Sequence, residues 1–323
     1  MKTGRPIETA QARYTKTISL ITPGPQGGHN WYPMSYNPDT GLVYVPTTQG
    51  GAFPYGIDTE FVYEPGAWNT GISLLQGSID EIPFRAQEDY SPGTGPKPPS
   101  PGVLLAWDPL ARRARWQVNY GIVSNGGTLT TAGNLVFQGI GDGHLMAYAA
   151  DHGEKLWQVD LGVGILAAPM TYMLDGKQYL SVLVGWGGMN GLVGPNYSGE
   201  YKAEGRLWTF ALDGERDFAP VLGMPLPALT EIGFDDSPAL LKRGAEEYSV
   251  RCLLCHGIEA ASSGVIADLR YSSEDTFAIF HDIVRKGAYT SMGMPNLGEF
   301  VSEEDAEAIK NYILSRRAAL MKN

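Results

Sequence analysis

The sequence predicts a β-propeller portion followed by an all-α domain, and three observations support this prediction. The chain of 323 residues contains 41 glycines, 22 prolines, 17 tyrosines and 7 tryptophans, a composition typical of many short strands separated by turns. A unit that ends in tryptophan recurs after 41 residues. From about residue 238 onward, the strand pattern gives way to helical periodicity.

The composition also limits the partners. The formal net charge is −11 and no run of lysine or arginine stands out, so we expect no nucleic acid partner. No stretch approaches the 18 uninterrupted apolar residues typical of a transmembrane helix. The opening residues, "MKTGRPIETAQARYTK", lack the apolar segment of a secretory signal.

Residues 1–214 are interpreted as propeller blades. The segments "AWDPLARRARW" and "AYAADHGEKLW" each place a tryptophan, Trp116 or Trp157, ten residues after an alanine at the end of a hairpin. With "GTLTT" and "NLVFQG" before it, the second segment completes a unit of four short strands, which is typical of one blade. Arg112 stands where the second copy has Gly153, and "RLWTFALDG" at 206–214 is a degenerate third copy. The alternative is two unrelated hairpins that both end in tryptophan.

The number of blades follows from the length. Residues 51–102 have little strand signal and end in the proline- and glycine-rich "SPGTGPKPPSPG", so most of them are expected to leave the propeller. The remaining β residues allow about four blades of roughly 40–45 residues each. An isolated half-propeller would have two open sheet edges, which proteins normally avoid.

The C-terminal part is expected to be a linker and a helical domain. Residues 215–237 belong to a proline-rich stretch and are interpreted as an extended linker. Residues 238–323 contain three helical patterns, "PALLKRGAEEYSVRC", "SEDTFAIFHDIVRKG" and "SEEDAEAIKNYILSRRAAL". Ser302 followed by Asp305 predicts a capping box at the start of the last helix.

Both cysteines of the chain lie in "CLLCH", residues 252–256, which is the C-x-x-C-H attachment signature of c-type haem. Cys252 and Cys255 on one helical turn can add to the two vinyl groups of haem, and His256 then becomes the proximal iron ligand. A structural zinc site usually needs a second pair of ligands, and a redox C-x-x-C pair would follow a strand in a βαβ unit. The helical context and the single cysteine pair therefore favour haem c.

The second axial ligand is expected in "SMGMPNLG". Met294 is preferred because Pro295 stiffens the loop after it, and Met292 is the reserve candidate. Methionine opposite histidine raises the haem potential and suits electron transfer. His281, on an apolar helix face, is interpreted as a packed and hydrogen-bonded residue rather than an axial ligand.

Two glycine-rich segments of the β region each contain a tryptophan. In "GGHNWYPMSYNP", Asn30 could bind a ring carbonyl and Trp31 offers an aromatic surface, while Trp186 does the same in "VLVGWGGMNG". Flanking glycines allow a flat ligand to approach the backbone closely. The alternative is that these tryptophans only pack between blades.

Taken together, the chain resembles the pyrroloquinoline quinone (PQQ)-dependent quinohaemoprotein alcohol dehydrogenases of the periplasm. The resemblance rests on "TGRP", "GGHNWYPMSYNPDTGLVYVP", "GVLLAWDP", "NLVFQGIGDGHLMAYAADHGEKLW", "LAAPMTYMLDGKQYLSVLVGWGG" and "CLLCHG" followed by "GMP". It implies about half of an eight-bladed PQQ-type propeller followed by a class I cytochrome c domain. By the same resemblance, Asn30 and Trp31 contact the quinone, Trp186 lies at its rim, and the haem is held by Cys252, Cys255, His256 and Met294.

The departures from the family concern its first half, which has no counterpart in this sequence. The resemblance therefore assigns to that half the vicinal disulfide, the tryptophan under the quinone, the Ca²⁺ ligands and the aspartate general base, so no catalytic residue is expected here. Lys2 is a substitute candidate for a basic residue that touches the quinone. PQQ and Ca²⁺ are expected in the intact enzyme rather than on this chain alone.

The expected function is to pass electrons from alcohol oxidation at the quinone to haem c and on to an external acceptor. The expected partners are a small alcohol or aldehyde, an acceptor protein or quinone, and the first half of the enzyme as a separate chain. Haem c and the family place the chain in the periplasm. The alternatives are a non-catalytic c-type electron-transfer protein with a β scaffold, and an inactive truncated remnant.

Overall fold

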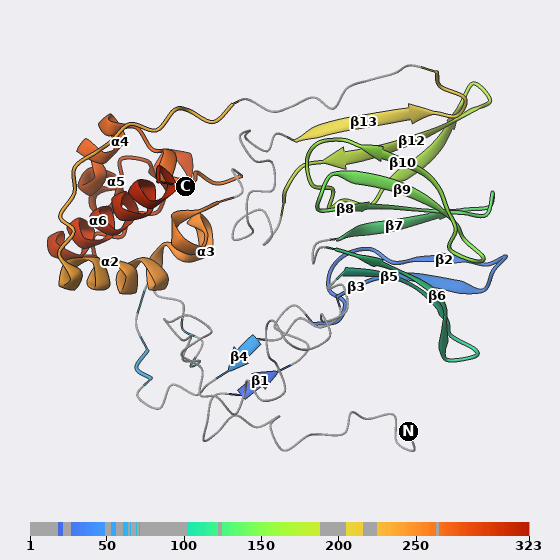
Figure 1. Ribbon diagram of the computed structural model, residues 1–323, viewed down its shortest axis with the longest axis horizontal. Helices are drawn as coiled ribbons and strands as arrows, with labels where there is room; N and C mark the ends of the chain where they lie inside the picture. The colour runs from blue at the N-terminus through green and yellow to red at the C-terminus, as the bar shows by residue number, and fades with distance from the viewer. Residues whose placement is uncertain are drawn as a thin grey trace.

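The computed structural model describes residues 19–21, 27–48, 53–55, 61–63, 65, 69, 71, 102–121, 125–187, 205–215, 225–262 and 265–322. The strands of these residues lie between Ser19 and Ala211, and the helices lie between Pro238 and Leu320. Sheets and helices form two separate groups in space (Figure 1). This arrangement agrees with the predicted order of a β portion followed by a helical domain.

The central sheet confirms the predicted four-stranded unit. Its strands are β7 (Asn125–Thr131), β8 (Leu135–Ile140), β9 (His144–Ala149) and β10 (Lys155–Asp160). Each strand pairs antiparallel with the next along the chain, in the order β10-β9-β8-β7. This meander is the topology of a propeller blade.

The first sheet has the same topology with one interruption. It consists of β2 (Ser35–Asn37), β3 (Leu42–Thr48), β5 (Gly102–Asp108) and β6 (Arg113–Tyr120), paired in that order. Between β3 and β5 the chain leaves this sheet, and β4 (Phe53–Tyr55) pairs instead with β1 (Ser19–Ile21). The excursion predicted for residues 51–102 begins there, and most of it lies outside the described residues.

The third sheet has three strands among the described residues. They are β11 (Met170–Leu174), β12 (Lys177–Val184) and β13 (Arg206–Ala211), in the order β11-β12-β13. The degenerate third copy of the sequence repeat is β13. Besides the β1–β4 pair, the described residues thus form two four-stranded sheets and one of three strands, where about four blades are predicted.

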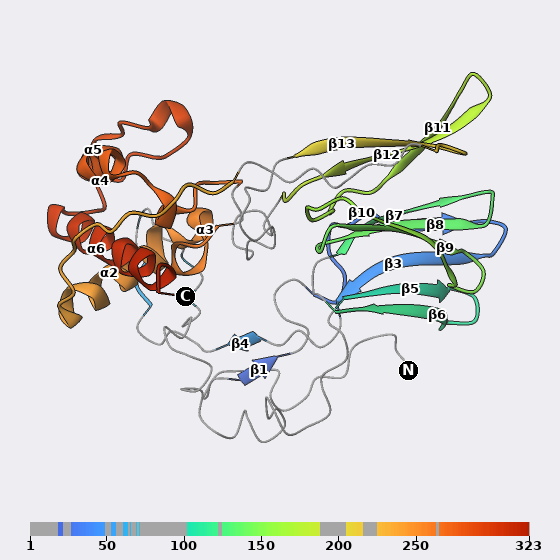
Figure 2. The same ribbon diagram turned by 45° about the horizontal axis from the view of Figure 1, so that its top comes forward.

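The two inner strands of the central sheet, β8 and β9, are buried on both faces. Because side chains alternate along a strand, β9 directs Leu145 and Ala147 into a core shared with β12, and Met146 and Tyr148 into a core shared with β3 and β5. The three sheets lie face to face in succession (Figure 2). This stacking explains why β8 and β9 are each buried at five of their six positions.

Trp116 connects the first sheet to the second by a hydrogen bond and by packing. Its indole Nε1 donates a hydrogen bond of 3.0 Å to the carbonyl oxygen of Ala150. Its ring covers Gly153, where an added Cβ would lie 2.7 Å from ring atoms. Gly153 has a φ of 80°, and Arg112, at the equivalent turn of the first sheet, keeps a positive φ of 54° without being glycine. The two copies therefore share a turn conformation despite the sequence difference.

The helical domain contains five α-helices and three short 3₁₀ helices among its described residues. They are α2 (Pro238–Arg251), α3 (Leu253–His256), η4 (Ile258–Ala260), η5 (Leu269–Tyr271), α4 (Glu274–Ala278), α5 (Phe280–Lys286), η6 (Thr290–Met292) and α6 (Glu303–Leu320). α2 crosses α6 at Gly244, where an added Cβ would lie 2.1 Å from the Ala308 oxygen. The single helix predicted for "SEDTFAIFHDIVRKG" is wrong in one respect, because Ile279 (φ −103°, ψ 19°) divides it into α4 and α5.

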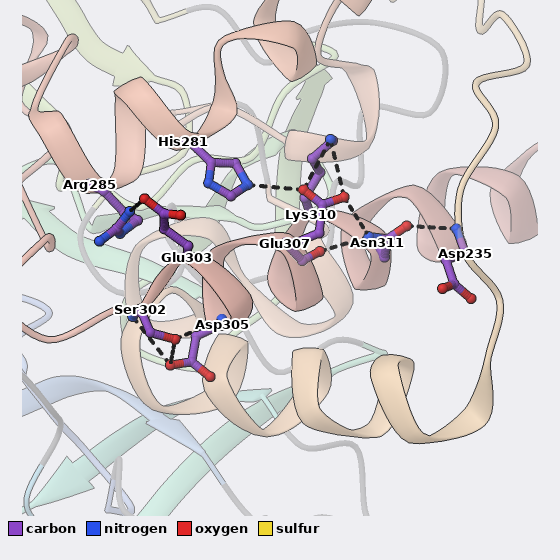
Figure 3. Close-up of polar contacts among 9 residues, drawn as sticks. All are labelled: Asp235, His281, Arg285, Ser302, Glu303, Asp305, Glu307, Lys310 and Asn311. Carbon is purple, nitrogen blue, oxygen red and sulfur yellow. Dashed lines mark hydrogen bonds and ion pairs between the residues drawn. The ribbon is translucent and has the colours of Figure 1, made fainter.

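The last part of the linker is bound to α6. The Asp235 backbone N–H donates to Asn311 Oδ1 at 2.7 Å. Asn311 Nδ2 in turn donates to the Glu307 backbone carbonyl oxygen at 2.8 Å (Figure 3). Buried Arg317 donates from Nε to the Thr230 carbonyl oxygen at 3.0 Å. Its other nitrogens donate to the Thr230 hydroxyl and to two more carbonyl oxygens, so this segment is bound to the helical domain.

The start of α6 carries the capping box that the sequence predicts. The Asp305 backbone N–H donates to the Ser302 hydroxyl at 3.0 Å, and the Ser302 N–H donates back to the Asp305 carboxylate at 3.3 Å (Figure 3). Asp305 also accepts from Arg243 of α2, at 2.8 Å from Nε, which joins the two main helices.

Candidate functional site

The two cysteines lie on one helical turn, with Cys252 between α2 and α3 and Cys255 within α3. The backbone N–H groups of Cys255 and His256 both donate to the Cys252 oxygen, at 3.1 and 2.9 Å. Both side chains are free thiols, with Cys252 buried and Cys255 exposed. This turn puts the two sulfurs on the same short segment as the histidine, which is the arrangement that attachment of a haem through two thioethers requires.

His256 is oriented by a backbone carbonyl. Its Nδ1 lies 2.9 Å from the Ala267 oxygen. A carbonyl oxygen can only accept, so Nδ1 carries the proton and the lone pair is on Nε2, the atom that a metal would bind. Burial lowers the pKa of His256, which favours the neutral, ligating form of the ring. This geometry fits a proximal haem ligand.

A thiolate metal site fits these residues less well. Burial raises the pKa of Cys252 to about 12, whereas a zinc-bound cysteine is a thiolate. Within the described part of the chain, no group of three or more His, Cys, Asp or Glu side chains converges in a way that could hold a metal ion. The donor set of two thiols and one oriented imidazole therefore matches haem attachment better than zinc.

The two candidate methionines have different environments. Met292 is 76% exposed at the end of η6. Gly293 then adopts a φ of 95° and turns the chain, so that partly buried Met294 packs against the helical core that also includes Cys252. The burial of its side chain supports Met294 over Met292.

His281 is hydrogen-bonded to the last helix, α6. It is on α5, and its Nε2 is 2.9 Å from the Glu307 carboxylate on α6 (Figure 3). The ring is hydrogen-bonded, as the sequence interpretation has it, but it is partly exposed rather than enclosed in the core. His144 and His152, to which no role is assigned, lie in the central sheet and its exposed turn.

The segment that carries Asn30 and Trp31 is anchored to β3. The Thr48 N–H donates to the Gly28 oxygen at 2.8 Å, and His29 Nδ1 lies 2.7 Å from the Pro46 oxygen. Asn30 Oδ1 accepts from the Trp31 N–H at 2.8 Å. The Trp31 side chain is 55% exposed, and its ring lies 4.4 Å from the ring of buried Tyr32. Trp31 therefore presents an aromatic face to solvent from a supported loop.

Trp186 is buried and partly structural. It follows β12, and its ring lies so close to Gly164 that a Cβ there would be 2.7 Å from it. The structure nevertheless places Trp31 and Trp186 in the wall of one open hollow of about 400 Å³. Arg206, at the start of β13, lines the same hollow and was missed by the sequence interpretation. The only sequence feature that marks Arg206 is its position as the first residue of the third copy of the repeat. Lys2 lies outside the described residues.

The haem candidates and the tryptophan-lined hollow belong to different parts of the molecule. Cys252, Cys255, His256 and Met294 lie in the helical domain, whereas Asn30, Trp31 and Trp186 lie among the sheets. In both views, α3 is on the side of the helices that faces the sheets (Figures 1 and 2). No described helix is long and apolar enough to cross a membrane.

Comparison with known proteins identifies both parts. Residues 101–180 match the β-propeller domain of glucose/ethanol/alcohol dehydrogenases, and residues 239–313 match the cbb3-type cytochrome c oxidase subunit III family. Quinohemoprotein alcohol dehydrogenase ADH IIB of Pseudomonas putida is 39% identical over 98% of this chain and 44% of its own length. The quinohemoprotein alcohol dehydrogenase of Comamonas testosteroni is 37% identical over 97% of this chain and 42% of its own length.

Solved structures agree with these sequence matches. The quinohemoprotein alcohol dehydrogenase ADHIIG from P. putida HK5 superimposes with a TM-score of 0.81 at 34% identity, covering 100% of this chain and 47% of that one. The C. testosteroni enzyme gives a TM-score of 0.76 at 37% identity, over 99% and 45%. The chain thus spans less than half the length of these relatives. It belongs to the family of quinohaemoprotein alcohol dehydrogenases, of which it represents the C-terminal propeller portion and the cytochrome c domain.

Proposed function

We propose that this chain provides one wall of the quinone site and the haem relay of a PQQ-dependent alcohol dehydrogenase. The observation that carries the proposal is the Cys252–His256 turn, with an oriented imidazole and a partly buried methionine in the same helical core. When bound, haem c supplies a centre that accepts and releases one electron at a time.

The helical residues would each have a distinct task at this centre. Cys252 and Cys255 would hold the porphyrin through thioethers, which prevents its loss. The hydrogen bond from His256 Nδ1 to the Ala267 oxygen keeps Nε2 oriented for iron. Met294 would provide the sixth ligand and exclude water from the iron. These roles favour electron transfer over chemistry that needs an open coordination position.

The β residues would form one side of the quinone pocket. PQQ supplies the two-electron oxidation of the alcohol. Trp31 offers an exposed face for a flat ring, and the bond between Asn30 and the Trp31 N–H holds their loop in place. Trp186 would close the rim, and Arg206 brings a positive charge to the same hollow, suited to a ligand that carries carboxylates. The proton-accepting base is not assigned to this chain.

The pocket needs further blades to be complete. The outer face of the third sheet exposes Met170, Tyr172, Leu183 and Leu207, an apolar surface of the kind that a neighbouring blade covers. The relatives are more than twice as long as this chain. We therefore propose that a polypeptide equivalent to their first half packs on this face, in the same protein or as a separate chain, and contributes the Ca²⁺ ligands and the base.

The substrate and location follow from the same proposal. A small alcohol or aldehyde would be oxidised at the quinone, and an acceptor protein or quinone would take electrons from the haem. Because haem c is attached after export, the protein would work in the periplasm.

The test is complementation in an exported form. The chain is produced with a secretion signal and haem c maturation factors, alone or together with the first half of P. putida ADH IIB. We expect covalent haem in both samples, and alcohol-dependent dye reduction with PQQ and Ca²⁺ only in the second. Turnover by the isolated chain would show that the site is complete without the other half. Absence of covalent haem would refute the proposed role of this chain in electron transfer.

A non-catalytic electron-transfer protein is the second candidate. It is favoured by the fact that all haem candidates and their core lie within residues 225–322, whereas the quinone hollow is open. Reversible haem reduction combined with no turnover in the complemented sample would select this function.

A further inference from the structure

An ion pair lies on the last turn of α2, directly before the first haem-attachment cysteine. Arg251 Nε donates to Glu247 Oε2 at 3.0 Å, and the two side chains are only 5% and 28% exposed. The same helix carries a second i,i+4 pair, Lys242–Glu246, but its side chains are 78% and 49% exposed and 3.9 Å apart. One helix thus holds a partly buried pair and an exposed pair of the same type.

The pKa of the Cys252 thiol shows the electrostatic effect of this partly buried pair. Burial raises the pKa of this thiol most, while the Arg251 guanidinium lowers the pKa and the Glu247 carboxylate raises it. Both charges therefore act at the sulfur, through surroundings that screen them much less than water does. Because this sulfur is the proposed point of attachment, the same charges act at the edge of the porphyrin.

Reduction of haem iron changes its charge by one unit, from Fe³⁺ to Fe²⁺, with one electron taken up. A nearby cation disfavours the more positive oxidised form, and a nearby anion favours it. We propose that Arg251 and Glu247 are positioning residues that set the haem reduction potential in opposite directions, Arg251 raising it and Glu247 lowering it. This inference rests on the proposed haem attachment at Cys252.

The paired arrangement has a consequence for the relay. As long as both charges are present, their effects on the iron largely offset each other, and the potential depends on the difference in their distances from the haem. Loss of one charge removes its share of this balance, so the potential should shift in the direction set by the charge that is lost. The exposed Lys242–Glu246 pair is screened by water and should have little effect.

The test compares matched variants of the exported haem protein by spectroelectrochemical titration. We expect Glu247→Gln to raise the midpoint potential, Arg251→Gln to lower it, and the double variant to return toward the parent value. Glu246→Gln removes the same charge one residue away and should leave the potential unchanged. Arg251→Lys should retain most of the parent value.

The outcomes separate this inference from the proposed function. Parent protein without a covalent haem band would refute the attachment itself. With haem attached, shifts of the same sign in Glu247→Gln and Arg251→Gln would indicate a general structural disturbance and overturn the inference. If Arg251→Gln does not fold, the comparison of Glu247→Gln with Glu246→Gln is sufficient. Equal midpoint potentials in these two variants would overturn the inference.

Discussion

Replacing Gly153 by alanine tests how the first and second sheets are held together. The added Cβ would lie 2.7 Å from the Trp116 ring, so the indole must move by several tenths of an ångström. Overpacking of this kind costs about 1–3 kcal/mol. The movement also weakens the 3.0 Å bond from Nε1 to the Ala150 oxygen, at about 1 kcal/mol. The positive φ of 80° adds about 1–2 kcal/mol for any residue with a side chain.

We therefore expect Gly153→Ala to lower the free energy of unfolding of the β portion by about 3–6 kcal/mol. Tryptophan fluorescence in a urea titration measures this selectively, because all seven tryptophans lie within residues 31–208. Gly176→Ala is the matched control, since Gly176 has a φ of 73° and nothing within 4 Å of an added Cβ. The free energy of unfolding of this variant should fall only by the cost of the positive φ, about 1–2 kcal/mol. Equal losses in the two variants would refute the role assigned to Trp116.

Three further predictions follow from other features. Arg112→Gly should stabilise the β portion by up to about 1 kcal/mol in the same titration, since Arg112 holds a positive φ, and a loss of stability would contradict this. Met294→Ala should convert a low-spin haem spectrum to high-spin or to a replacement ligand, whereas Met292→Ala should not; the reverse result would move the ligand to Met292. Burial opposes ionisation of Asp305, but Ser302 and Arg243 lower its pKa overall. Its contribution to stability is therefore complete above its unfolded pKa and lost as the pH falls through the folded value. Asp305→Asn should flatten the acid dependence of helical unfolding measured by circular dichroism, and an unchanged pH profile would exclude this contribution.

Local patterns predicted much of this structure because they depend on residues close together in the chain. The four strands of the central sheet follow from alternation and from the recurrence of Trp116 and Trp157. The capping box at Ser302 depends only on a residue three positions later. The C-x-x-C-H motif likewise needs a single helical turn to bring its three side chains together.

The features that were missed depend on partners distant in sequence. The stretch 215–237 was interpreted as an extended linker, but Thr230 is bound by Arg317, 87 residues away. Apolar periodicity continues through Ile279, so the break between α4 and α5 leaves no local signal. Arg206 joins the tryptophan-lined hollow only because β13 pairs with β12 next to Val184. None of these contacts can be obtained from a window of neighbouring residues.

The attachment of the linker to α6 also limits how far the helical domain can lie from the sheets. Because Thr230 is held by Arg317, the tether between the two domains runs from the end of β13 at Ala211 to Thr230, rather than to the start of α2 at Pro238. At about 3.5 Å per residue, this shortens the greatest possible span from about 95 Å to about 65 Å. In the proposed enzyme, a shorter tether would keep the quinone pocket and the haem at a high effective concentration, so the rate of transfer between them would not depend on how dilute the protein is.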